Sequence, residues 1–539
     1  MKTTRCLRLF RLLAIFLGGS SIGLTACGQQ LNAIGVTLLR SVVTNADGTG
    51  VRVAQPEAQG TNIPPDFEVN PGNASVQQPT SLFTYINTNG SVSSFPNSLG
   101  TESGHADDVA GNFYGTPSGV ATNVAHVDNY NGSFFYAYII AAILPTNIYD
   151  RVVNQSFIFG YVPSEVPVSQ QQQLDSQFDN YAAQYNTLFV SGAGNGGPGS
   201  GTVAPPSTCY NGISVGAYGY AGSSVGPTED NGRAKPDITA PAGATSFSTP
   251  QVAGAAAVLM QTGLRGDGGN DTNAVADIRT VKALLLNGAV KPADWTNDPP
   301  SPLDPRYGAG ILNVFNSYEQ LAGGEHGYIV ATSVPSGGAH PPPGATGSLG
   351  ALSGWDFNTN TSGTNSDEIN HYYFDVTNGG NAAFTATATL VWNRQQNQGG
   401  INNLDLFLYN AANSNLVICS TSMVDNVEQV FVPQLAPGRY DLQVWKAGGI
   451  PGMSIVSFSE TYALAWEFSS TFLTPKLSNG NLLLSWPIYP DGFVLASATN
   501  LATPVVWSTN TPLPVVTNGQ NWILVSPTNA SQFFRLQPP

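Results

Sequence analysis

The stretch PAGATSFSTPQVAGAAAVLMQ, residues 241–261, decides the fold. It places hydroxyl residues and a proline directly before a run of small apolar residues. The run VAGAAAVLM predicts a buried helix, since alanine has the best helix propensity and small side chains permit close packing. Because proline is tolerated near a helix start and poorly in its middle, we expect the helix to begin around Ser246. Its first turn would present a hydroxyl beside unpaired backbone N–H groups.

A serine before a helix is most often only an N-cap, because its hydroxyl accepts hydrogen bonds from the first N–H groups. Other segments of the chain argue for a chemical role of Ser246, since they carry a histidine, an asparagine after glycine, and a carboxylate after an apolar strand. These segments are SGHADDVAGNFYG (103–115), SGAGNGG (191–197) and GVRVAQPEA (50–58).

The composition is that of an acidic, weakly charged protein. The chain has 539 residues, enough for roughly two to four domains. Asp and Glu number 34 against 19 Lys and Arg, a net charge of −15. This balance argues against a nucleic-acid partner, whose affinity comes largely from Lys and Arg on phosphates. Charged residues make up only 10% of the chain, which is common in secreted β-rich proteins.

Residues 1–27 have the three-part layout of a secretory signal, with basic residues, an apolar core and small residues in that order. The apolar core is too short to span a membrane as a stop-transfer helix. The segment LTAC ends at Cys27 and resembles a bacterial lipobox, in which the cysteine is lipidated. We favour this interpretation, and ordinary cleavage near Ala26 is the alternative. The protein is therefore expected to be secreted or in the cell envelope, where Cys27 would be its lipid anchor if LTAC is a lipobox.

The cysteines indicate no metal site and no disulfide framework. The chain lacks a ligand spacing such as C-x-x-C. Cys209 and Cys419 lie far apart in the chain, so we do not expect them to form a disulfide.

Few residues separate Cys27 from the first strand, so folding is expected either without a pro-domain or with help from a downstream domain.

Strand-like and helix-like runs alternate between residues 46 and 323. The alternation predicts an α/β domain with a mostly parallel sheet, in which sites gather at the carboxyl ends of the strands. Strands are expected at 50–55, 187–194 and 212–219, and helices at 133–144, 169–186 and 274–289 in addition to the one after Ser246.

Residues 324–355 are predicted to be a linker, because they include the Gly/Pro-rich stretch 337–354. Beyond the linker the hydrophobic pattern changes to period two. The pattern predicts an antiparallel β-sandwich over 356–468 and a small β module over 469–539.

The motifs resemble those of subtilisin-like serine proteases. GATSFSTPQVAG is similar to the family's nucleophile motif G-T-S-x-[AS]-x-P-x-V-A-G, which implies that Ser246 is the nucleophile, with Ala244 in place of the usual Gly. SGHADDVAGNFYG resembles the histidine motif H-G-T-x-V-A-G, which gives His105 the catalytic position. The strand ending in A-G-N implies that Asn195 donates its side-chain amide to the developing oxyanion.

The acid departs from the family pattern. The family has G-V-x-V-A-V-x-D, and counting from Gly50 puts Glu57 at the position of the Asp. The acid accepts the Nδ1–H of the histidine and fixes its tautomer, and Glu can do this if the backbone allows the longer reach. Asp66, in PPDFEVN (64–70), is the alternative acid.

Further segments follow the family's order. VVNQSFIFG (152–160) resembles the strand that pairs with the substrate, which implies that Ser156 and Phe157 border the pocket for the residue before the cut. Additional resemblances lie at 223–243 and 304–314, so the likeness covers about 46–323.

The resemblance implies a subtilisin-like catalytic domain over 28–323, with a parallel sheet flanked by helices and followed by two all-β domains. The expected activity is that of a monomeric serine endopeptidase that acts on polypeptides and needs no organic cofactor. Family members often bind structural calcium, but its ligands are not assigned here. One alternative is a decayed protease that binds peptides, suggested by Glu57, Ala106 and Ala244; another is an esterase. The joint presence of His105 and Ser246 with the oxyanion asparagine favours a working enzyme.

Overall fold

The computed structural model describes most of the chain; the predicted signal at 1–27 and the predicted anchor residue Cys27 lie outside the described residues. The described residues are 30–160, 165–338, 346–376, 384–453, 455–469 and, with short gaps, 473–537. No helix among them is long and apolar enough to cross a bilayer.

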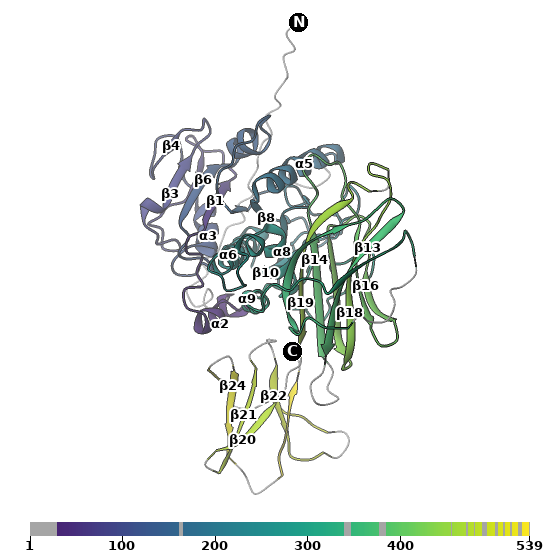
Figure 1. Ribbon diagram of the computed structural model, residues 1–539. Coiled ribbons are helices and arrows are strands. Elements are labelled where there is room, and N and C mark those ends of the chain that lie inside the picture. The colour runs from purple at the N-terminus through teal and green to yellow at the C-terminus, as the bar shows by residue number, and fades with distance from the viewer. Residues whose placement is uncertain are drawn as a thin grey trace.

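A central sheet of eight strands organises the first domain (Figure 1). The strands lie in the order β10-β9-β8-β7-β1-β6-β3-β4, and every neighbouring pair except β3–β4 is parallel. The central strands are buried on both faces, as expected for a parallel sheet covered by helices. Their bounds are β1 Arg52–Glu57, β3 Phe83–Ile86, β4 Val92–Ser93, β6 His126–Asn131, β7 Val152–Gln155, β8 Leu188–Gly192, β9 Ile213–Tyr218 and β10 Ile238–Pro241. A separate short pair joins β2 (Asp66–Glu68) to β5 (Thr101–Glu102).

The predicted helices are present, with two differences. The helix predicted over 133–144 is a short α-helical turn followed by a π-helical segment, and it ends at Ile140. The stretch predicted as one helix over 274–289 forms two, because the Asp277 side chain accepts a hydrogen bond from the Arg279 N–H and starts a new helix there. The helices are α2 Val36–Val42, α3 Gly104–Phe113, α4 Gly132–Phe134 with the π-helical turn η2 Phe135–Ile140, α5 Val168–Tyr185, α6 Thr245–Leu264, α7 Thr272–Val275, α8 Ile278–Asn287 and α9 Val314–Ala322; a short 3₁₀ turn, η1, spans Thr80–Leu82.

Helix α6 runs through the core of this domain. All its residues are buried except Ser246, Phe247 and Leu264. Small side chains are needed along it because neighbouring elements approach closely. A Cβ atom added to Gly254 would lie 2.6 Å from Cβ of Val120, closer than packed atoms allow. Close packing therefore requires the small residues in the stretch 241–261.

Two antiparallel sheets form the predicted β-sandwich, in the orders β11-β13-β18-β15-β16 and β12-β19-β14-β17. The linker prediction is corrected here, because Val330–Pro335 within the predicted linker forms strand β11 and pairs with β13. The other strands are β12 Ser353–Thr361, β13 Ser366–Val376, β14 Phe384–Trp392, β15 Leu404–Asn410, β16 Asn415–Ser420, β17 Val427–Leu435, β18 Gly438–Lys446 and β19 Ser459–Ser469.

The sandwich packs directly on α8 and α9. Trp355, Val391 and Ala463 of the sandwich belong to the same hydrophobic cluster as the α/β domain. The Trp355 indole N–H donates to the Leu321 carbonyl at the end of α9, 3.1 Å away. Asn287 at the end of α8 accepts hydrogen bonds from two threonines of β14. The sandwich has its own core between its two sheets, and its β12-β19-β14-β17 sheet also contributes residues to the core of the α/β domain.

A third unit follows, with its own small core of Leu484, Trp486, Leu495 and Ile523. Its strands are β20 Thr474–Ser478, β21 Asn481–Pro487, β22 Val494–Ala498, β23 Val515–Thr517, β24 Gln520–Val525 and β25 Phe533–Gln537. The prediction of an α/β domain followed by two all-β domains is confirmed.

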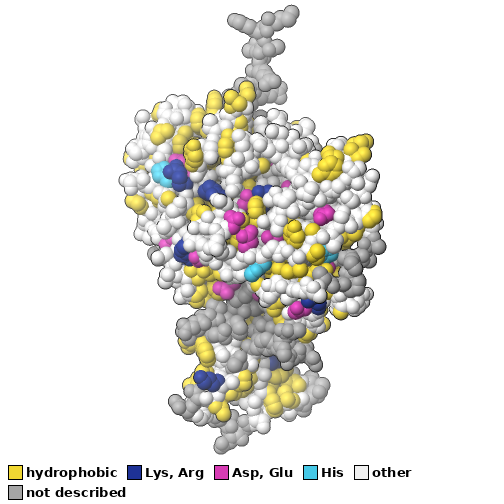
Figure 2. Space-filling view, viewed as in Figure 1, with side chains coloured by type: hydrophobic (Ala, Val, Ile, Leu, Met, Phe, Trp, Pro, Cys, Tyr) yellow, Lys and Arg dark blue, Asp and Glu magenta, His cyan; other side chains and the backbone are white. Residues whose placement is uncertain are grey.

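The surface carries few charges, and the two described cysteines form no disulfide. Charged side chains are sparse on the face drawn in Figure 2, as expected from a chain with 10% charged residues. Cys209 is buried and Cys419 is half-buried, and both are free thiols.

We predict that Trp355→Ala lowers the free energy of unfolding by about 3–5 kcal/mol, because it empties a fully buried site between the two domains. Denaturant unfolding followed by circular dichroism measures the loss. Trp445→Ala, at a half-buried tryptophan in β18, is the control and should cost less. Two well-separated transitions in the wild type for the α/β domain and the sandwich would contradict a shared core.

Candidate active site

The sheet brings the predicted site residues to the carboxyl ends of its strands. Glu57 is the last residue of β1, and Asn195 follows the end of β8. His105 lies in the first turn of α3, which begins there because Ser103 caps the helix by accepting from the Ala106 N–H. Ser246 lies in the first turn of α6, after β10. This edge of the sheet is where α/β folds place their sites.

Glu57 contacts His105 as the motif implied. Nδ1 of His105 lies 2.9 Å from Oε2 of Glu57. The Glu57 side chain is 1% exposed and that of His105 is 18% exposed, so the carboxylate is enclosed while the imidazole reaches solvent. Burial lowers the pKa of His105, but the charge and hydrogen bond of Glu57 outweigh it, and the net pKa is raised. Donation from Nδ1 leaves Nε2 as the basic nitrogen of the neutral ring.

The alternative acid, Asp66, lies elsewhere. It begins strand β2, and its carboxylate packs against the backbone at Gly60, where an added Cβ would sit 2.2 Å from Oδ1. The structure therefore assigns the contact with His105 to Glu57 and leaves Asp66 in a loop contact.

Ser246 is not the N-cap of its helix. The N-cap is Ala244, whose side chain offers no oxygen. Its φ of −164° is extended backbone that any residue adopts, so the family's usual glycine is not required there. The serine hydroxyl is thus placed in the first turn without the capping role that would otherwise explain it.

Asn195 takes over part of the capping of α6. Its Oδ1 accepts from the Thr245 N–H at 3.0 Å and from the Thr245 hydroxyl at 3.1 Å. These two contacts orient the Asn195 amide. Its oxygen faces the start of α6, so the Nδ2 group points the opposite way and can donate a hydrogen bond there. Asn195 is exposed, so that donor group lies at the surface beside the start of α6. The arrangement suits an oxyanion donor.

Pro250 explains how the backbone of Ser246 is held. A proline lacks the N–H that would bond the carbonyl four residues earlier, which here belongs to Ser246. The Ser156 hydroxyl donates to that carbonyl instead, at 2.9 Å. Ser156 in turn accepts from Nδ2 of Asn154. The predicted pocket residue Ser156 therefore anchors the serine segment.

The second predicted pocket residue, Phe157, turns inward. It is 8% exposed and its ring makes an edge contact with Phe159 at 5.9 Å between centroids. The structure thus places Phe157 in an aromatic cluster of the core, and its role in a pocket stays a prediction.

Sequence reasoning missed two neighbours of the histidine. Phe247 lies next to Ser246, and its ring centroid is 6.0 Å from that of His105, so the two rings pack together. Gln55, buried on β1, donates from Nε2 to Oε1 of Glu57 at 2.8 Å. The only sequence signal for Gln55 was a polar residue within an apolar strand.

Asp107, two residues after His105, has a structural role. Asp107 accepts from the Asn70 N–H at 2.6 Å and from Nδ2 of Asn73 at 2.8 Å, which fixes the adjacent loop to α3. Burial raises the pKa of Asp107 to about 8. Among the described residues no group of three or more His, Cys, Asp or Glu could hold a metal ion, so no ligand set for calcium is identified there.

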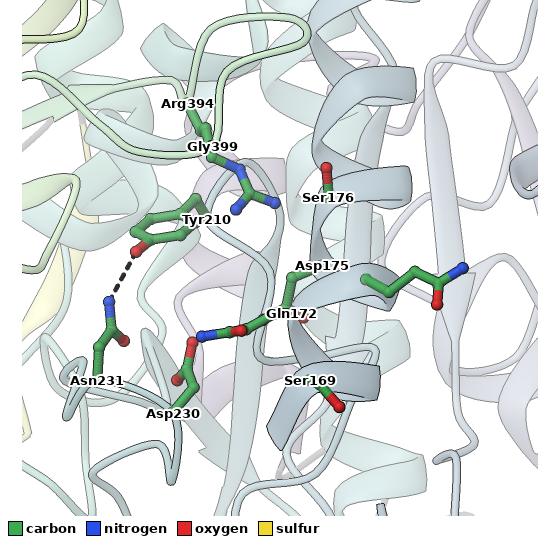
Figure 3. A pocket seen from close by; sticks show the side chains of 10 residues that line it. Ser169, Gln172, Asp175, Ser176, Tyr210, Asp230, Asn231, Arg394 and Gly399 are labelled. Atoms are coloured by element: carbon green, nitrogen blue, oxygen red, sulfur yellow. Dashed lines mark hydrogen bonds between the residues drawn. The ribbon is translucent and has the colours of Figure 1, made fainter. Parts of the chain in front are cut away.

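A polar cavity of about 370 Å³ lies at the junction with the sandwich (Figure 3). It is lined by residues of α5, by Tyr210 and by Arg394, which follows β14. The predicted site residues are not among those lining it. Arg233 and Arg394 both pack on the ring of Tyr210, so charged side chains brace the junction here.

Comparison with known proteins gives one family match. Residues 49–310 match the family model described as the subtilase family. No curated protein matches the chain. Among solved structures, the prenylagaramide maturation protease PagA is 19% identical and covers 53% of this chain and 98% of its own, with a TM-score of 0.37. Sphericase is 19% identical, covering 52% and 97% with a TM-score of 0.34, and the S41 psychrophilic protease is 17% identical, covering 52% and 97% with a TM-score of 0.33.

We predict that the pH profile for labelling of Ser246 by a fluorophosphonate has an acid limb with a midpoint above 6.5, the ordinary histidine pKa. His105 must be neutral to accept the serine proton, and Glu57 raises its pKa. Glu57→Gln should move the midpoint to lower pH and slow labelling by up to about 10⁴-fold. Asp66→Asn is the matched control and should leave the midpoint unchanged; the opposite pattern would make Asp66 the acid.

Removing the amide donor gives an independent prediction. Asn195→Ala should lower kcat on a peptide substrate by about 10²–10³-fold with little change in KM, because the donor acts on charge that develops only in the transition state. Steady-state kinetics measures both. A change confined to KM would mean that Asn195 only binds substrate.

Proposed function

This chain belongs to the subtilase family through residues 49–310, and we propose that it is a secreted serine endopeptidase that cleaves extended polypeptides with Ser246 as its nucleophile. The observation that carries the proposal is the 2.9 Å contact between Nδ1 of His105 and the enclosed carboxylate of Glu57. A buried carboxylate that accepts from Nδ1 fixes the imidazole tautomer needed for a general base.

The reaction is acyl transfer from a peptide to Ser246. His105 removes the hydroxyl proton as the oxygen attacks the peptide carbonyl. The amide of Asn195 and the N–H of Ser246 stabilise the oxyanion. The amino terminus of the 20-residue helix α6 adds positive potential beside that charge. His105 then protonates the leaving amine, and water hydrolyses the acyl-enzyme.

The substrate is an extended polypeptide, part of whose backbone pairs with the enzyme by strand addition. The basic, apolar and small residues of 1–27 support export of the protein, and LTAC ending at Cys27 supports a lipid anchor in the cell envelope. Two measurements distinguish lipid anchoring from ordinary cleavage near Ala26. An anchored protein would change in mass when cells are treated with globomycin, and a lipase would release it from membranes.

A decayed, peptide-binding subtilase is the competing function. Its grounds are Glu57, Ala106 and Ala244. Ala244 is extended and needs no glycine, and Glu57 reaches His105. The Ala106 carbonyl accepts a hydrogen bond from the buried Gln55 amide. The departures at Ala244 and Glu57 are thus accommodated by the local structure, which favours a working enzyme.

The proposal predicts that a fluorophosphonate labels the purified protein and that Ser246→Ala abolishes labelling. Ser248→Ala is the matched control, because Ser248 lies in the same helix and its hydroxyl donates only to the Thr245 carbonyl. Digestion of a peptide library with mass-spectrometric readout then identifies the cleaved bonds. A folded wild type that is not labelled would support the binding protein, and one that is labelled but cleaves no peptide would be an esterase.

A further inference from the structure

The acid of this site is one methylene longer than the Asp of the motif G-V-x-V-A-V-x-D. The extra methylene adds a rotatable bond between the backbone and the carboxylate, so Glu57 has more orientations available than Asp would. A second departure lies two residues earlier, where Gln55 stands in the place of a valine. Residues two apart on a strand point to the same face, so the two departures are neighbours in space.

Contacts on the Gln55 side chain connect the two departures. Nε2 of Gln55 donates to Oε1 of Glu57 at 2.8 Å and to the Ala106 carbonyl at 3.0 Å. The other carboxylate oxygen, Oε2, contacts His105. Both oxygens of Glu57 are therefore held. Because Ala106 follows His105 in the chain, the same amide also ties β1 to the first turn of α3.

Tyr114 fixes the orientation of this amide. Its hydroxyl donates to Oε1 of Gln55 at 2.5 Å, which assigns the amide oxygen away from Glu57 and the nitrogen toward it. Tyr114 is fully buried, and its ring packs against Phe83 and Phe113. Burial raises the pKa of Tyr114, so the hydroxyl stays a donor. The amide cannot titrate, so the support acts at every working pH.

We propose that Gln55 and Tyr114 are positioning residues that orient the Glu57 carboxylate toward His105, an inference that rests on the proposed function. Without the amide, Oε1 loses its donor in a fully enclosed position and the longer side chain can rotate away from the imidazole. The buried Tyr114–Gln55–Glu57 chain therefore compensates for the added length of the acid.

The test compares Gln55→Leu and Tyr114→Phe with the wild type. Misplacing a catalytic group slightly can cost about 10²-fold, so we expect Gln55→Leu to lower kcat and the labelling rate of Ser246 by about that factor with KM unchanged. Tyr114→Phe removes one hydroxyl and should cause a smaller loss. Gln261→Leu is the control: this buried glutamine holds Asp47 and Gly48 near the far end of α6 and should leave kcat unchanged.

A double-variant cycle separates positioning from a general structural effect. If Gln55 acts through Glu57, adding Gln55→Leu to Glu57→Gln should cause no further loss of labelling rate. An equal loss in both backgrounds, or wild-type kcat in Gln55→Leu, would overturn the proposal. Should Gln55→Leu fail to fold, the same cycle with Tyr114→Phe decides.

A readout without turnover keeps this inference separate from the proposed function. In Ser246→Ala protein labelled with ¹⁵N-histidine, NMR titration reports the pKa of His105. Gln55→Leu should lower that pKa toward the ordinary value, because the hydrogen bond from His105 to Glu57 loosens. An unchanged pKa would overturn the positioning role. A wild type that fluorophosphonate does not label would reject the protease proposal and leave this titration valid.

Discussion

Burial of helix α6 is the constraint on which the site depends. All its residues are buried except Ser246 and Phe247, which are half-buried in its first turn, and Leu264, which is exposed at its end. Close approach of neighbouring elements explains the small residues, as Gly254 against Val120 shows. Because Pro250 lacks an N–H, the Ser246 carbonyl accepts a hydrogen bond from the hydroxyl of Ser156, which follows β7. A serine held by packing and by this hydrogen bond has a fixed position, as the proposed reaction requires.

A hydroxyl, an imidazole and a carboxylate in line do not by themselves make a site. The sandwich has such a line, in which Thr332 lies 2.7 Å from Nε2 of His371 and Asp441 lies 2.9 Å from Nδ1. Thr332 belongs to strand β11, whereas Ser246 lies in the first turn of a helix. His371 is 1% exposed, whereas the side chain of His105 reaches solvent. Ser246 differs from Thr332 in its surroundings. It lies at the amino-terminal turn of α6, where Asn195 contacts the neighbouring Thr245.

The two domains that follow the α/β domain differ in how they are joined to it. The sandwich covers α8 and α9 and shares their core through Trp355, while Asn287 is satisfied by threonines of β14. Burying an amide such as Asn287 is costly unless it is paired, so this junction is specific as well as apolar. The last module has a separate core around Trp486. Stability of the α/β domain is thus coupled to the sandwich through the buried cluster to which both contribute.

The sequence by itself determined the α/β domain, the two β domains and the identity of the residues at the candidate site, because periodicity and ordered motifs are local. It left Glu57 and Asp66 as rival acids, joined α7 to α8, and assigned β11 to a linker. Only the tertiary structure decided that Glu57 meets His105, that Phe157 turns inward, and that Gln55 holds the carboxylate. Those outcomes depend on which strands and helices lie side by side, and contacts between residues such as Gln55 and Tyr114, 59 positions apart, leave no local pattern in the chain.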